Sequence, residues 1–293
     1  MRISVAIGAL PGYPLCSTLA IASEAHADGV ELLLSSGMSA TNPLATQQLA
    51  DEVNIPITSL HAVLRFRSTT FDRKLADDCA SIRFAAGLRD CAVVVLHPPL
   101  TGARPSAQLN RWLADIVSER DRTRPDLRLA LENRAQNHDG VERQLLDDLS
   151  TLRSVAGEWD VHLTLDLAHA ASWGTHVTDA VDTVMSRLVN LHLSDSRSST
   201  MRGGIRNGLY RDHLLPGDGY LPIDEVIHRL TQHAYDGQIT IELSPVSLRA
   251  WWPPSARRRL REAVNTVRAM SRVAPPVDHH DVAQKRTARS PER

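Results

Sequence analysis

A chain of 293 residues with 42% hydrophobic side chains can bury a large core, and it is long enough for a single α/β barrel domain. The formal net charge of −1 gives no electrostatic bias toward nucleic acid, although a local basic groove is compatible with a neutral total. The three cysteines, Cys16, Cys79 and Cys91, form no CxxC pair and indicate reduced thiols in a cytoplasmic protein. No segment approaches the roughly 20 apolar residues of a membrane span, so we expect a soluble protein with no membrane partner.

The chain alternates short, apolar, β-branched runs with longer amphipathic stretches eight times. This alternation predicts βαβ units on a parallel sheet, and eight units in about 250 residues predict an α/β fold closed into a (β/α)8 TIM barrel. A doubly wound open sheet is the alternative, but the first turn, GALPGYP, lacks the GxGxxG phosphate-binding pattern. The expected strands are Ile3–Ala9, Gly29–Leu34, Ile57–Val63, Ala92–His97, Arg128–Glu132, Val161–Leu167, Leu188–Leu193 and Gln238–Leu243. The expected helices include Phe71–Arg89, Ala107–Arg120, Val141–Ala156 and Ile223–His233.

Two segments fall outside this regular pattern. Residues 1–272 are expected to form the barrel, whereas residues 273–293 are polar, charged and interrupted by proline, which predicts a disordered tail. The connection Ser196–Leu221 after the seventh strand is long and rich in glycine. Connections of this length in a compact domain are typical of lids or binding segments.

Four of the predicted strands end on a side chain that can bind metal. These are Glu132 in LRLALEN, Asp166 in VHLTLDL, His192 in LVNLHLS and Glu242 in QITIELS. Because a parallel α/β barrel assembles its active site at the C-terminal ends of its strands, we expect the four side chains to converge. Three carboxylates and one imidazole are suited to a divalent cation, with Mn²⁺ or Mg²⁺ favoured by the oxygen ligands.

The side-chain alternation within these strands agrees with a shared direction. Side chains two residues apart in a strand face the same way, and the residues in phase with the four candidate ligands are small or polar. They are Ala130, Thr164, Asn190 and Thr240. The out-of-phase residues are aliphatic, so the candidate ligands are predicted to face the barrel interior and the aliphatic residues the helices.

Further histidines repeat the arrangement. His61 in SLHAV and His97 in VVVLHPP end the third and fourth strands and are candidates for a second metal, for which their imidazoles also make Zn²⁺ suitable. His169 lies three residues after Asp166 and could reach the same barrel mouth. Arg197 follows the seventh strand, and His213 and Asp218 lie in the long connection.

Taken together, the motifs resemble those of the xylose isomerase-like TIM-barrel superfamily. That superfamily contains sugar and sugar-phosphate isomerases and epimerases, related dehydratases, and endonuclease IV-type apurinic endonucleases. The resemblance spans residues 1–272 and indicates the superfamily more specifically than any one reaction. It depends on the motifs LHAV, LHPP, LENRAQN, LDLAHAASWG, LHLSDSR, HLLPGDGYLPI and IELSP.

Resemblance to the ketose epimerases implies a single divalent metal, often manganese, bound by the four strand-end residues. It also implies that Glu132 and Glu242 are the acid–base pair, one removing a proton next to a carbonyl to give an enediolate and the other returning it. His169, Arg197 and His213 would then contact substrate, although Arg197 lies one residue from the position of the epimerases' substrate-binding arginine. The expected substrate is a small carbohydrate or polyol.

Resemblance to the endonuclease branch implies three zinc ions held by nine residues. Eight of those positions match, and the ninth, an aspartate two residues before His213, is Arg211 here. A cation in that place opposes a third metal, but two metals bridged by Glu132 remain open. The missing ligand, the neutral charge and the 4% aromatic content favour carbohydrate chemistry over abasic DNA.

A barrel that binds a ligand without turnover is a third interpretation, since fold alone does not guarantee activity. The motifs leave open isomerase, epimerase or dehydratase chemistry, phosphorylation of the substrate and the oligomeric state, for which a homodimer is the commonest form.

Overall fold

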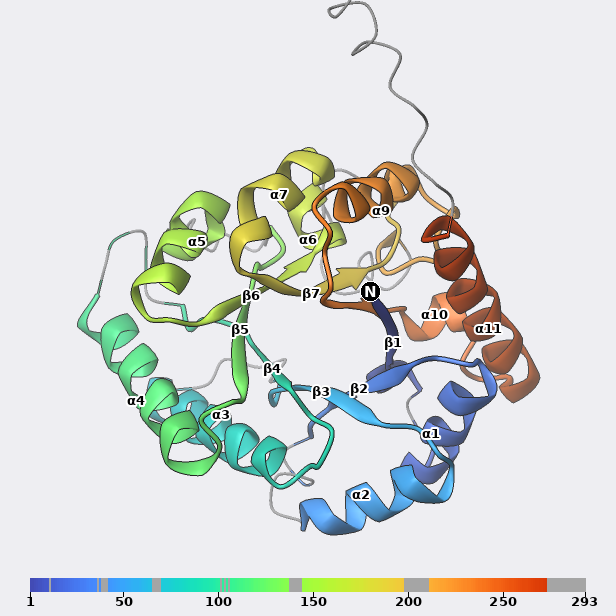
Figure 1. Ribbon diagram of the computed structural model, residues 1–293, viewed down its shortest axis with the longest axis horizontal. Coiled ribbons are helices and arrows are strands. Elements are labelled where there is room, and N and C mark those ends of the chain that lie inside the picture. Colours follow the sequence, from blue (N-terminus) through green and yellow to red (C-terminus); the bar gives the residue numbers. More distant parts are fainter. Residues whose placement is uncertain are drawn as a thin grey trace, which may run out of the picture.

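The computed structural model describes residues 1–10, 12–35, 37, 42–64, 70–100, 102, 104, 106–136, 144–197 and 211–272. Within them, eight strands pair in parallel and close into a barrel in the order β1 to β8, with β8 pairing back to β1. Figure 1 looks along this barrel, with the strands at the centre and the helices around them. The predicted (β/α)8 TIM barrel is therefore confirmed. The predicted tail and residues 198–210 of the long connection lie outside the described residues.

The elements alternate along the chain as the hydrophobic pattern predicts. The strands are β1 Arg2–Ala6, β2 Gly29–Leu33, β3 Ile57–His61, β4 Val93–Leu96, β5 Arg128–Glu132, β6 His162–Asp166, β7 Leu188–Leu193 and β8 Gln238–Ile241. The α-helices are α1 Leu15–Glu24, α2 Pro43–Glu52, α3 Phe71–Ala86, α4 Ala107–Thr123, α5 Leu149–Glu158, α6 Leu167–Ser172, α7 Val177–Val184, α9 Ile223–Gln232, α10 Pro245–Leu248 and α11 Pro253–Met270. Short 3-10 turns are Ile7–Ala9, Leu145–Asp147 and Met185–Arg187. No helix in the described ranges has the length and apolar character needed to cross a membrane.

Several predicted element boundaries were wrong by one to three residues at the strand ends. The first strand stops at Ala6 and continues as a 3-10 turn, and the sixth stops at Asp166, where the side chain caps α6 by accepting a hydrogen bond from the backbone N–H of His169 at 2.6 Å. Such capping ends the strand because the following residues take up helical geometry. Glu242 lies one residue beyond β8.

The largest correction concerns the predicted helix Val141–Ala156. Its first three residues are not described, and the rest divides into the 3-10 turn Leu145–Asp147 and the helix α5. Asp148 separates them: its backbone is extended, and its carboxylate accepts a hydrogen bond from the backbone N–H of Thr151 at 2.8 Å. An aspartate in this position begins a new helix rather than continuing an old one.

The barrel interior and the outer layer are chemically different. A small apolar cluster of Val93, Val95, Ala130 and Val189 is separate from the main core that joins strands to helices. Below the C-terminal mouth the interior is polar, as the side-chain alternation predicts. There Asn190 Nδ2 donates to Glu31 Oε2 at 2.9 Å, and Thr240 Oγ1 donates to Asn190 Oδ1 at 2.8 Å. The buried polar layer makes the strand ends a rigid base for the side chains above.

The buried carboxylate of Asp78 on α3 links this helix to α4 outside the barrel. Asp78 is fully buried, and its carboxylate accepts hydrogen bonds from Lys74 Nζ at 2.9 and 2.7 Å. Trp112 Nε1 on α4 donates to the same carboxylate at 2.7 Å, and the Trp112 side chain is also fully buried. A hydrogen bond to a charged acceptor in such a place contributes more to stability than one between neutral groups.

We therefore expect Trp112→Phe to lower the free energy of unfolding by about 1–3 kcal/mol, because it removes a donor to a buried carboxylate. Urea denaturation followed by circular dichroism measures this change. Trp251→Phe is the matched control, since Trp251 is 71% exposed and its replacement should leave stability unchanged. Equal midpoints for the two variants would contradict the assigned role of the Trp112–Asp78 bond.

Candidate metal centre

The four predicted strand-end side chains converge at the C-terminal mouth of the barrel. Glu132, Asp166, His192 and Glu242 each offer one ligand atom, and these atoms all lie within 4.8 Å of one another. Glu132, Asp166 and His192 are buried, whereas the side chain of Glu242 is 29% exposed. The group therefore has a buried floor and one carboxylate that reaches toward solvent.

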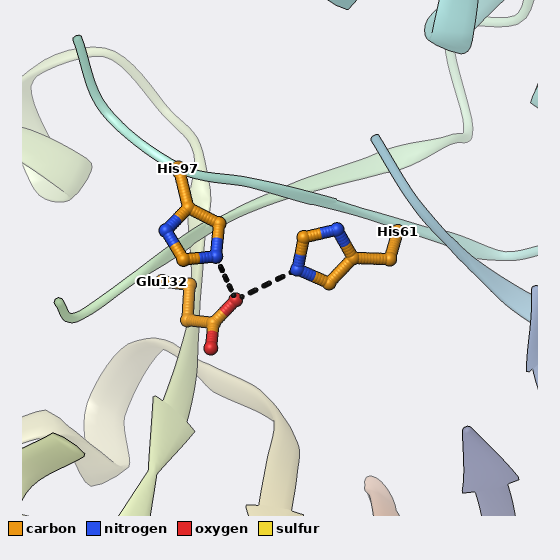
Figure 2. A group of neighbouring side chains, drawn as sticks. All are labelled: His61, His97 and Glu132. Atoms are coloured by element: carbon orange, nitrogen blue, oxygen red, sulfur yellow. Dashed lines mark hydrogen bonds and ion pairs between the residues drawn. The ribbon is translucent and has the colours of Figure 1, made fainter. Parts of the chain in front are cut away.

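A second group shares Glu132. Figure 2 shows the imidazoles of His61 and His97 pointing at one carboxylate oxygen of Glu132. The distances from Oε2 to the two Nε2 atoms are 3.1 Å for His61 and 3.0 Å for His97. Because Oε1 of the same carboxylate lies 3.3 Å from His192 Nδ1, Glu132 links the two groups.

A third group contains Asp166, His169 and His213, again with ligand atoms within 4.8 Å of one another. The rings of His169 and His213 lie edge to face with centroids 5.7 Å apart. His213 adopts a left-handed backbone conformation with φ of 51°, and its ring atom Nδ1 lies 3.3 Å from the hydroxyl oxygen of Ser194. The resemblance to the epimerases gave these two histidines as substrate contacts, whereas the resemblance to the endonuclease branch counted them, with Asp166, among the eight matching zinc-ligand positions; the structure brings the three together.

The side chain of Asn133 fixes the backbone of Asp166, the last residue of β6. Its side-chain Oδ1 accepts a hydrogen bond from Asp166 N at 2.7 Å, and its Nδ2 donates to Asp166 O at 3.0 Å. Its backbone oxygen lies 3.0 Å from His169 Nδ1. With the proton on Nδ1, the Nε2 atom of His169 is the one left to meet a cation or a substrate oxygen.

Burial and neighbouring histidines have opposite effects on the pKa values of Glu132 and Glu242. Burial acts to raise the pKa of Glu132, but the neighbouring His97 and His192 outweigh it and hold this pKa well below its ordinary value. Burial likewise opposes ionisation of Glu242, and the adjacent His192 overcomes it and lowers the pKa of Glu242. Both side chains are therefore carboxylates at neutral pH, which is the form that can bind a cation or accept a proton.

Burial and the neighbouring carboxylates also shift the pKa values of the histidines. Burial lowers the pKa of His97, whereas the pKa of His192 is raised well above its ordinary value because Glu31, Glu132 and Glu242 outweigh the burial of its ring. The pKa of His61 is also raised, since its contact with Glu132 exceeds the effect of burial. The carboxylates thus make the centre of the site electrostatically favourable for positive charge.

The unsatisfied atoms of the site fit a divalent cation. Within the described part of the chain, Asp166 Oδ2 and both ring nitrogens of His192 are buried without a hydrogen bond of good geometry, and Nε2 has only the 2.9 Å ion-pair contact with Glu31 Oε1. His192 Nδ1 lies 2.8 Å from Glu242 Oε2 and 3.3 Å from Glu132 Oε1. Buried polar atoms without partners are costly, and a cation surrounded by these oxygens and this nitrogen would satisfy them together.

Arg197 and Arg211, which stands at the missing ninth zinc position, are in none of the three ligand groups. Arg197 is exposed, and its Nε donates to the backbone oxygen of Asp218 at 3.0 Å. Arg211 is also exposed, and the neighbouring Asp212 is buried with its carboxylate accepting a 2.6 Å hydrogen bond from Ser196 Oγ. One oxygen of Asp212 is therefore bonded to Ser196, and although Asp212 interacts electrostatically with His213, Asp166 and His169, it is not among the residues of the three metal-ligating groups.

Sequence reasoning missed two buried acids beside the site, Glu31 and Asp195. Glu31 lies in the middle of β2 and places Oε1 2.9 Å from His192 Nε2. Its signal in the sequence is a carboxylate inside the apolar run GVELLL, where a surface residue is not expected. Asp195 follows β7 within the quoted motif HLSDSR.

Asp195 organises the connection that carries His213. Its carboxylate accepts hydrogen bonds from the backbone N–H groups of Ser196, Gly217, Gly219 and Leu221 at 2.8 to 3.0 Å. Gly219 approaches so closely that an added Cβ would collide with Asp195 Oδ1. An ionised carboxylate with several backbone donors is a strong anchor for a loop.

Comparison with known proteins agrees with this geometry. The family described as xylose isomerase-like TIM barrel matches residues 19–270. The chain belongs to this family. Among curated proteins, an uncharacterised protein of Mycobacterium leprae is 27% identical over 271 residues, which is 85% of this chain and 91% of that protein.

Solved structures of xylose isomerase-like barrels share the fold at low identity. The 3-keto-D-glucoside 4-epimerase of E. coli is 18% identical with a TM-score of 0.67, covering 92% of this chain and 99% of that one. The D-psicose 3-epimerase of Clostridium cellulolyticum H10 is 13% identical with a TM-score of 0.69, covering 93% and 100%. At these identities the likeness shows the architecture, and the function must be argued from the site.

Because Asp195 anchors the connection after β7 of this xylose isomerase-like barrel, Asp195→Asn should loosen it. In the variant an NH₂ group replaces one carboxylate oxygen and faces backbone N–H groups that need an acceptor. The free energy of unfolding should therefore fall by about 1–3 kcal/mol. Hydrogen exchange at Gly217, Gly219 and Leu221 should accelerate more than exchange in the strands. Asp218→Asn is the control, since the Asp218 side chain is 46% exposed and its carboxylate contacts Arg259 at 3.4 Å, not the backbone N–H groups that Asp195 holds. Unchanged exchange in Asp195→Asn would contradict the anchoring role.

Proposed function

We propose that this protein is a divalent-metal-dependent isomerase or epimerase of a sugar, a sugar phosphate or a related polyol. The observation that carries the proposal is the convergence of Glu132, Asp166, His192 and Glu242 within 4.8 Å, with two glutamates in the same cluster. Manganese or magnesium suits the oxygen-rich ligands, and zinc suits the adjoining histidines. The reaction would transfer a proton next to a carbonyl through an enediolate.

The chain's own residues provide the base and the acid. A divalent cation held by the four residues would polarise the substrate carbonyl and so acidify the neighbouring C–H bond. Glu132 and Glu242 are ionised at neutral pH and both approach His192 Nδ1, so either can take the proton while the other returns one. Glu242 is partly exposed and can meet an incoming substrate, whereas His61 and His97 hold Glu132 in a fixed position.

Other residues at the mouth would bind the substrate. His169 is 14% exposed in its side chain and its Nε2 atom is available to a hydroxyl oxygen. His213 lies beside it on the segment that Asp195 anchors. Arg197 would contact substrate through its terminal nitrogens, since its Nε donates to the backbone oxygen of Asp218. The epimerases among the structural relatives support a carbohydrate as the substrate class.

An endonuclease acting on abasic DNA is the second candidate function. The observation in its favour is the set of three neighbouring ligand groups, which corresponds to the three metals of the endonuclease IV-type enzymes. Two features oppose it: Arg211 stands where a ligand is expected, and one carboxylate oxygen of the adjacent Asp212 already accepts a hydrogen bond from Ser196. Low aromatic content also leaves few side chains to open a duplex. A ligand-binding barrel without turnover is the third candidate.

The metal content of the purified protein tests the first part of the proposal. Protein isolated without added metal should contain at least one equivalent of a divalent ion by elemental analysis, and Glu242→Gln should lose most of it because a charged ligand becomes neutral. His97→Asn should remove a second equivalent, where one is bound, and leave the first. Glu225→Gln on α9, whose side chain is exposed, is the control. Equal metal content in Glu242→Gln and the control, or none in any protein, would refute the metal site.

The fate of the substrate hydrogen tests the second part. A panel of ketoses and aldoses with Mn²⁺, Mg²⁺ or Zn²⁺ in D₂O should give a product carrying deuterium on carbon. Glu132→Gln and Glu242→Gln should each slow turnover by about 10²–10⁴-fold, since general acid–base catalysis contributes on that order. Retention of every carbon-bound hydrogen would indicate a hydride shift instead. Chelator-sensitive nicking of an abasic duplex in the same panel would favour the endonuclease.

A further inference from the structure

The interior of the barrel contains a buried carboxylate that the proposed chemistry does not use. Glu31 on β2 is 1% exposed, and it lies on the far side of the His192 ring from Glu132 and Glu242. Its Oε1 atom is 2.9 Å from His192 Nε2, whereas the two catalytic glutamates approach Nδ1. The two ring nitrogens therefore face different carboxylates.

Glu31 is held rigidly. Its second oxygen, Oε2, accepts hydrogen bonds from Ser59 Oγ at 2.8 Å and from Asn190 Nδ2 at 2.9 Å. Ser59 in turn accepts from Gln238 Nε2 at 2.7 Å. All of these side chains are buried, so water does not compete for the carboxylate.

This environment leaves one oxygen of Glu31 to be satisfied. Burying a carboxylate is costly unless donors or a positive charge meet it, and Ser59 and Asn190 both serve Oε2. Among the described residues, His192 is the one with an ion-pair contact to Oε1. The Nε2 atom of His192 must carry its proton to act as that partner.

We propose that Glu31 is a positioning residue that keeps the proton of His192 on Nε2 and so presents Nδ1 to the metal. The inference builds on the proposed metal site but concerns a different residue and a different property, the tautomer of one ring. Since the unprotonated nitrogen of a neutral imidazole is the one that binds a metal, a carboxylate opposite Nε2 decides which nitrogen is the ligand. A carboxylate behind a ligating histidine also orients the ring and increases its basicity.

The same network reaches from the metal group into the barrel. Asn190 lies two residues before His192 on β7 and Ser59 two residues before His61 on β3, so both strands that bear these histidines also hold Glu31. The side-chain alternation places each pair on the interior face. Replacing Ser59 or Asn190 should therefore affect the metal site indirectly, by changing the position of Glu31.

The test compares Glu31→Gln with Glu119→Gln. Glu119 is a 4% exposed glutamate on α4, outside the barrel interior, and serves as the matched control. Glu31→Gln should weaken metal binding by about 10- to 100-fold, the usual effect of losing a residue behind a ligand, while Glu119→Gln should bind metal like the wild type. Titration calorimetry with Mn²⁺ or Zn²⁺ measures the affinities.

A spectroscopic readout separates positioning from a general loss of structure. Long-range ¹H–¹⁵N spectra of protein labelled at histidine report the tautomer, with the His192 signals assigned by their absence in His192→Asn. The wild type loaded with Zn²⁺, and the metal-free wild type at a pH where the ring is neutral, should both carry the proton on Nε2. In Glu31→Gln the Nδ1–H form should become populated, and Glu119→Gln should match the wild type.

Two outcomes would overturn the inference: wild-type affinity and tautomer in Glu31→Gln, or a proton on Nδ1 in the wild type itself. If Glu31→Gln does not fold, Ser59→Ala removes one anchor of the carboxylate and should give a smaller shift in the same direction, and no shift there would also overturn it. A wild type that binds no metal would defeat the proposed function alone, because the metal-free spectra still test the role of Glu31.

Discussion

The central physical constraint in this barrel is the concentration of negative charge around one buried imidazole. Glu31, Glu132 and Glu242 all lie within 3.3 Å of a nitrogen of His192, and Asp166 belongs to the same cluster. Carboxylates this close repel one another, and low dielectric surroundings strengthen that repulsion. The cluster of carboxylates requires positive charge at its centre. The histidines can provide only part of it, because several carboxylates compete for each protonated ring. The proposed divalent cation would meet the requirement and would provide a partner for atoms such as Asp166 Oδ2, which has none among the described residues.

The rest of the architecture keeps these groups in place. Parallel strands bring their C-terminal ends to one mouth, so residues more than 100 positions apart, such as Glu132 and Glu242, share one cluster. The polar layer beneath them, centred on Glu31 and Asn190, gives the site a base of fixed hydrogen bonds. Asp195 does the same for the segment that carries His213. Precise placement of ligands thus depends on buried carboxylates that do not touch substrate.

One glutamate belongs to two ligand groups, which relates the two enzyme functions considered for this chain. Oε2 of Glu132 faces His61 and His97, while Oε1 faces His192. A single-metal sugar enzyme uses the second contact, and a multi-metal enzyme uses both. The position of Arg211 and the orientation of Asp212 toward Ser196 then favour the smaller metal set.

The sequence by itself determined the barrel, its eight strands and the candidate ligands, because hydrophobic alternation and strand-end acids are local patterns. It placed strand ends less well, since capping by Asp166 and the new helix start at Asp148 depend on side-chain hydrogen bonds. Only the tertiary structure decided how closely His169 and His213 approach Asp166, and that Glu31 lies behind His192. Those relations arise from contacts between strands that are distant in the chain, and a buried glutamate within an apolar run carries no local sign of its partner.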